Sequence, residues 1–121
     1  MKLKGVELLY NAAAHFSSLE KYPDGLVPEL LKKDKSSFDA LCWALAEMAR
    51  QGELYRRYMG ETPKEYPTEE TFAIGLRPNQ ITAAYELCMA EIAKGLAKPD
   101  EENEEIDLVL MEIQKKTRPT G

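Results

Sequence analysis

Residues 36–61, SSFDALCWALAEMARQGELYRRYMGE, constrain the fold more than any other stretch, because their apolar side chains recur every three or four positions. The recurring residues are Phe38, Leu41, Cys42, Leu45, Met48 and Ala49. This spacing places them on one face of an α-helix. Trp43 lies off that face, so we expect the helix to contact neighbours on two sides and to occupy the centre of a helical bundle.

The ends of this helix are predicted from capping residues. Ser36 or Ser37 is the expected N-cap, and Ser36-x-x-Asp39 resembles a capping box. Gly52 is the expected stop, because glycine readily adopts the left-handed conformation that ends helices. A second short helix would then hold Leu54, Tyr55, Tyr58 and Met59 on one side and end at Gly60. We interpret the whole stretch as core and not as a nucleotide site, although Arg and Tyr together can stack on a base.

The remaining helices are predicted from caps and prolines. Asn11 precedes a helix whose apolar stripe includes Ala13, Phe16 and Leu19. Two further short helices are expected in LVPELLKK (26–33) and, after the cap Thr68, in EETFAIG (69–75). The longest helix should begin at Pro78, which suits a first helical position. Its buried side is expected to hold Ile81, Ala84, Tyr85, Leu87, Cys88, Ile92 and Leu96. Residues 2–10 alternate imperfectly, which leaves open a short strand or a hairpin bent at Gly5.

The predicted fold class is mainly α, a single compact bundle of about five to six short and medium helices. Residues 1–99 form the helical domain, and residues 100–121 form an acidic linker followed by a short amphipathic helix. The apolar stripe of that last helix consists of Ile106, Val109, Leu110 and Ile113, which are the candidate partner-binding residues. They either dock in a groove of another chain or cover the core of their own domain, and the sequence leaves both interpretations open.

Charge and composition exclude several function classes. The net charge of −5 argues against nucleic-acid binding, which depends on Lys and Arg at phosphates. No apolar run approaches the ~20 residues that cross a bilayer, and the N-terminus is unlike a secretory signal. Cys42 and Cys88 are isolated, so we expect reduced thiols in a cytoplasmic protein and no metal site.

Motifs for catalysis are not found in the sequence. GxGxxG, GxxxxGK[ST], HExxH and GxSxG do not occur. His15 is the single histidine, on an Ala-rich segment, which favours a structural role. We therefore expect no enzyme activity and no cofactor.

Four segments carry a resemblance to a known family. They are YPDGLVPELL (22–31), FDALCWALAEMARQGELYRRYMGE (38–61), PTEETFAIGLRPNQITAAYELCMAEIAKGL (67–96) and EEIDLVLMEIQKK (104–116). In this order they resemble the tail assembly chaperones of long-tailed bacteriophages, of the siphovirus or prophage type. The shared features are helix boundaries, such as the Thr-Glu-Glu helix start and the proline that opens the long helix.

The resemblance implies a small helical protein without catalytic residues. It would bind the tape measure protein, or another tail protein, in the cytoplasm of the bacterial host, and it would self-associate as a homo-oligomer. The alternative is a small helical bacterial adaptor or regulatory module that binds a protein unrelated to phage. Neither function calls for nucleic acid or a membrane as a partner.

Overall fold

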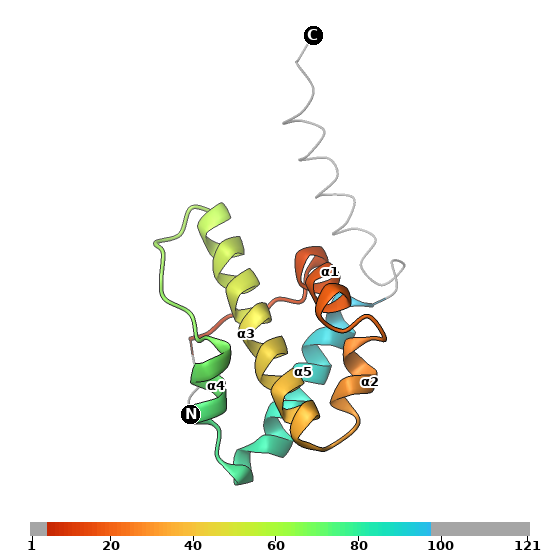
Figure 1. Ribbon diagram of the computed structural model, residues 1–121. Helices are drawn as coiled ribbons and strands as arrows, with labels where there is room; N and C mark the ends of the chain where they lie inside the picture. Colours follow the sequence, from red (N-terminus) through yellow and green to blue (C-terminus); the bar gives the residue numbers. More distant parts are fainter. Residues whose placement is uncertain (1–4, 98–121) are drawn as a thin grey trace.

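The computed structural model describes residues 5–97 as a bundle of five α-helices and one 3₁₀ turn (Figure 1). The elements are α1 (Ala12–Lys21), α2 (Leu26–Leu30), α3 (Lys35–Tyr58), α4 (Glu69–Gly75), η1 (Pro78–Gln80) and α5 (Ile81–Gly95). This confirms the mainly α fold class. No strand occurs within the described residues. Residues 6–10 form no regular element, and their backbone bonds to a helix, since the Leu9 amide donates to the Met48 carbonyl at 3.1 Å.

The central position predicted for α3 is confirmed. In Figure 1, α3 runs through the middle of the bundle, with α4 on one side and α1, α2 and α5 on the other. It contacts all four of the other α-helices. Its N-cap is Asp34, not Ser36 or Ser37: the Asp34 carboxylate accepts from the Ser37 amide at 3.0 Å and from the Ser36 hydroxyl at 2.6 Å. An extended Asp caps as well as Ser does, so the helix begins earlier than predicted.

The prediction that Gly52 ends this helix is wrong. α3 continues through Gly52 to Tyr58, and its 24 residues make it longer than α5, which has 15. Gly52 serves a different purpose, because a Cβ at this position would collide with the backbone carbonyl of Glu7. The glycine lets the N-terminal segment lie directly on the helix. Gly95, at the end of α5, likewise leaves room for the carbonyl of Tyr10.

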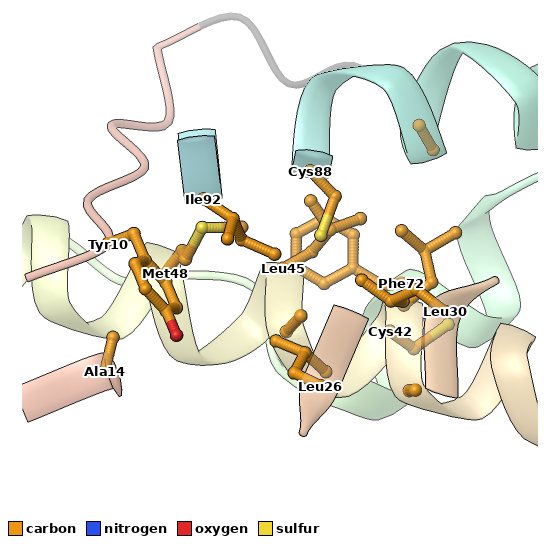
Figure 2. Close-up of a cluster of buried hydrophobic side chains, with 14 residues drawn as sticks. Tyr10, Ala14, Leu26, Leu30, Cys42, Leu45, Met48, Phe72, Cys88 and Ile92 are labelled. Carbon is orange, nitrogen blue, oxygen red and sulfur yellow. The ribbon is translucent and has the colours of Figure 1, made fainter. Parts of the chain in front are cut away.

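The core consists of the apolar face of α3 and the side chains packed against it (Figure 2). Leu41, Cys42, Leu45 and Met48 are fully buried, as the periodicity predicted. They meet Leu30, Phe72, Cys88 and Ile92, among others, from the surrounding helices. Both thiols are free, as expected. Burial raises the pKa of Cys42 to about 11 and that of Cys88 to about 12.

The buried face of α1 differs from the prediction. Ala14 and Ser18 point into the bundle, whereas Phe16 and Leu19 are exposed. The reason is Tyr10, which is buried and whose hydroxyl lies 3.1 Å from Ser18 Oγ and 3.0 Å from His15 Nδ1. Small side chains are needed for this approach, and the hydrogen bond gives His15 a structural role. The Asn11 cap is confirmed, with its side chain accepting from the Ala14 amide at 2.9 Å.

The buried face of α5 is narrower than predicted. Ala84, Cys88 and Ile92 are buried, Ile81, Tyr85 and Leu87 are partly buried, and Leu96 is exposed. Pro78 opens η1, and α5 follows directly from it. Thr68 caps α4 as expected, with Oγ1 accepting from the Thr71 amide at 3.3 Å. α4 thereby places Phe72 in the core.

Trp43 is only partly buried, packing edge-on against Tyr22 with ring centroids 5.7 Å apart. A fully buried Trp would lose about 3–5 kcal/mol on truncation to Ala. For Trp43→Ala we expect a smaller loss, about 2 kcal/mol, and for Leu45→Ala, which is fully buried, about 3 kcal/mol. Urea unfolding followed by circular dichroism measures both. A larger loss for Trp43→Ala than for Leu45→Ala would contradict this ranking.

Gly52→Ala should destabilise the fold by about 2 kcal/mol, because the new Cβ displaces the Glu7 backbone from α3. The same substitution at an unobstructed helix position stabilises a helix by up to about 1 kcal/mol. The sign of the change in unfolding free energy therefore shows whether the N-terminal segment lies on α3. A stabilised Gly52→Ala variant would show that the N-terminal segment does not lie on α3.

Candidate functional site

The last two turns of α3 have two unlike sides. One side carries Glu53, Arg56 and Arg57, and the other carries Leu54, Tyr55, Tyr58 and Met59. At 3.6 residues per turn the centres of these two groups lie about 180° apart around the helix. In Figure 1 this end of α3 reaches beyond α4, and the connection to α4 runs beside it.

Glu53 anchors that connection to the helix. Its carboxylate accepts from Arg56 Nη1 at 2.6 Å, from Arg57 Nε at 2.9 Å and from the Lys64 backbone amide at 2.7 Å. The two guanidinium groups also donate to the loop, Arg56 to the Thr62 carbonyl at 3.3 Å and Arg57 to the Lys64 carbonyl at 3.2 Å. We call Glu53, Arg56, Arg57 and Lys64 the carboxylate anchor. It fixes an otherwise irregular loop against α3.

The electrostatics of the anchor favour ionised Glu53. The residue is buried, and a buried carboxylate requires charged or hydrogen-bonding partners. The amide of Lys64 is the largest influence, and together with the guanidinium groups of Arg57 and Arg56 it lowers the pKa of Glu53 to about 2 against the opposing effect of burial. Arg56 and Arg57 are thus both engaged by a local carboxylate and by carbonyls of the loop.

The opposite side is an exposed apolar surface, which we call the tip stripe: Leu54, Tyr55, Tyr58 and Met59. Their exposed fractions are 39%, 48%, 66% and 59%. The rings of Tyr55 and Tyr58 lie 6.5 Å apart between centroids. The prediction that these residues share one side of a helix is confirmed, but the interpretation of residues 54–59 as core is wrong. The core face of α3 ends before them.

The predicted partner-binding residues Ile106, Val109, Leu110 and Ile113 lie outside the described residues. The tip stripe was not predicted as a site, although its large apolar residues, which alternate in pairs with charged residues of the anchor, were visible in the sequence. The anchor has a sequence signal as well, because Arg56 and Arg57 follow Glu53 at three and four positions.

Residues 5–97 contain neither a candidate metal site nor a candidate membrane-spanning helix. In this part of the chain no three His, Cys, Asp or Glu side chains are grouped so that they could hold a metal ion. No helix in the same range combines the length and the apolar character needed to cross a membrane. The tip stripe is a group of exposed apolar and aromatic side chains, a kind of surface that typically marks contacts with another molecule.

Comparison of the chain with protein-family models, with curated proteins and with solved structures gives no match.

Glu53→Gln should change how stability depends on pH. Because the folded pKa is lowered from 4.5 to about 2, the ionised carboxylate stabilises the fold fully above pH 4.5, and this stabilisation is lost as the pH falls toward 2. The gap in urea midpoint between the native chain and Glu53→Gln should thus be constant above about pH 5 and shrink below it. Glu61→Gln is the matched control, because the Glu61 carboxylate also lies near Arg56, at 3.7 Å, but is exposed to solvent. A gap that does not depend on pH would contradict the anchor.

Proposed function

We propose that this protein is a non-enzymatic tail assembly chaperone of a phage or prophage, which binds the tape measure protein during tail morphogenesis in the host cytoplasm. The resemblance of the four sequence segments suggests the family. The observation that carries the proposal is the tip stripe, an exposed apolar surface on a helix end that the carboxylate anchor holds in place.

The tip stripe has the chemistry that protein interfaces favour. Tyr and Met are enriched at interface cores, and Tyr is among the residues that contribute most binding free energy. A long helical client offers an apolar stripe of its own, against which an exposed helix face can pack.

The anchor supports the proposal through rigidity. Ordering side chains and loops on binding costs free energy, and a surface that is already fixed avoids part of this cost. Arg56 is mostly buried and Glu53 is buried beneath the loop, so the helix end is held before any partner arrives.

The adaptor alternative differs from this proposal in its partner. A chaperone gene is expected between a tail-tube gene and a very long tape measure gene, with a slippery sequence near the end of the reading frame that yields a longer product. An adaptor gene has no such neighbours. Absence of a long tail gene beside this one would favour the adaptor.

Tyr55→Asp should abolish client binding, because a charge at the centre of the tip stripe would be buried without a partner in the complex. The measurement is co-purification of the co-expressed neighbouring long protein with the tagged chain. Loss of at least about tenfold in recovered client is expected. The matched control is Ile74→Asp on α4, a substitution at an apolar residue that is 77% exposed but lies outside the stripe.

Equal recovery of the client with Tyr55→Asp and with the native chain would overturn the tip stripe as the binding surface. Failure of the native chain to retain the long neighbouring protein would overturn the function itself. Circular dichroism on each variant separates loss of binding from loss of fold.

A further inference from the structure

A groove lies at the opposite end of α3 from the tip stripe. It has a volume of about 470 Å³ and runs between the end of α2, the start of α3 and the first half of α5. Its apolar lining consists of Leu30, Leu31, Phe38, Ile81, Tyr85 and Met89, which we call the α2–α5 groove. Voids of roughly 150 Å³ already hold a benzene-sized group, so this groove has room for several aliphatic side chains.

The floor of the groove is fixed by a polar contact. Ser37 Oγ and the Tyr85 hydroxyl lie 2.7 Å apart and join α3 to α5. Ser37 is fully buried, and its hydroxyl also donates to the Asp34 carbonyl at 2.8 Å. Tyr85 therefore has its polar end satisfied, while its ring lines the groove. An apolar occupant would therefore leave neither the Ser37 nor the Tyr85 hydroxyl without a partner.

The apolar face of α5 leads from the groove to the point where the described chain ends. Ile81, Tyr85 and Met89 follow one another at four-residue intervals, and Leu96 falls on the same side of the helix at 100° per residue. Leu96 is 54% exposed although it is a large apolar residue at the end of a packed helix. Leu96 thus adds exposed apolar area near the end of the described chain, on the side of α5 that lines the groove.

We propose that residues 106–113 of the same chain dock in the α2–α5 groove through Ile106, Val109, Leu110 and Ile113. The sequence leaves two interpretations open for these four residues. The groove favours the one in which they cover the core of their own chain. The inference does not rest on the proposed function.

Chain length fits this docking. Met89 and Ile81 lie about 12 Å and about 24 Å back along α5 from Ala97. Residues 98–105 extend over at most about 26–29 Å. Ile106 can therefore reach either end of the groove. A helix from 106 to 113 is about 12 Å long, which matches the length of α5 between Ile81 and Met89.

Energetics favour the docked arrangement. A helix of this length is marginal by itself in water because nucleation is costly. Docking would remove four aliphatic side chains from water, which is favourable in proportion to the apolar area buried. A short tether also gives the segment a high effective concentration at the groove, so no second chain is required.

Cross-linking between introduced cysteines tests the proposal in the full chain without any client. Thr82→Cys places a thiol on the rim of the groove, and Asp107→Cys places one beside the stripe without altering it. A short bis-maleimide then joins the two thiols if the segment is docked. Cys42 and Cys88 do not compete for the cross-linker, because both are buried. Burial raises the pKa of both thiols, and a protonated thiol reacts slowly.

The control pair is Ala13→Cys with Asp107→Cys. Ala13 is exposed near the start of α1. The backbone of Tyr10, just before α1, adjoins Gly95 at the end of α5. An undirected segment would meet this position at least as often as Thr82. We expect the Thr82 pair to give at least about five times the intrachain product of the Ala13 pair, as effective concentration at a docked site requires.

A matched pair of substitutions then tests the docking face. Leu110→Asp should reduce the product of the Thr82 pair to that of the Ala13 pair, because it would bury a charge in the groove. Leu108→Asp is the same change on the opposite side of the predicted helix and should leave the product unchanged.

Three results would overturn the proposal. One is equal cross-linking of the Thr82 and Ala13 pairs. Another is an equal effect of Leu110→Asp and Leu108→Asp. The third is cross-linking only between differently tagged copies in a mixture, which would identify a second chain as the occupant. Since no client is present, none of these results bears on the proposed chaperone function.

Discussion

Burial of the apolar face of α3 is the interaction on which every other element depends. The helices around it are short, between 5 and 15 residues, and helices of such length are unstable alone in water. Each is stabilised by what it packs against, and that is α3 in every case. α4 illustrates this dependence, because its seven residues are held to the bundle chiefly through Phe72, which is fully buried. A defect in the α3 face would therefore unfold the bundle as a unit.

Small residues determine how closely the N-terminal segment approaches this helix. Gly52 on α3 and Gly95 on α5 each lie against a backbone carbonyl of residues 7–10, so the segment passes between the two helices. Tyr10 fills the space so created and reaches Ser18 and His15 with its hydroxyl. This arrangement explains why α1 buries Ala14 and Ser18, since larger side chains there would leave no room for Tyr10. Tyr10 thus fixes the N-terminal segment, α1 and α5 relative to one another.

The contacts of Gly52 and Tyr10 mark the limit of prediction from the sequence. Periodicity and caps sufficed for the mainly α fold class, the approximate positions of the helical segments and the buried face of α3, because these follow from local spacing and hydrogen bonding. Gly52 looked like a stop, since the sequence does not reveal that Glu7 lies against it from 45 positions away. Phe16 and Leu19 looked buried for a similar reason, because the choice of face was made by Tyr10 and not by hydrophobicity. The tip stripe escaped prediction because helical spacing identifies a shared face but not whether anything covers it.

α3 also separates the tip stripe from the α2–α5 groove. The α2–α5 groove adjoins Ser37 and Phe38 near the start of the helix, and the tip stripe lies at Leu54–Met59 near its end. Sixteen residues of continuous helix between Phe38 and Leu54 correspond to about 24 Å, which exceeds the reach of any side chain. A molecule docked at the tip therefore does not touch the groove. Coupling between the two surfaces would require α3 to have two discrete arrangements, and a helix packed on several sides around a close-packed core resists such change. For this reason the proposed client binding at the tip and the proposed docking of the C-terminal segment in the groove would be independent of each other, and a substitution in one surface should leave the other unaffected.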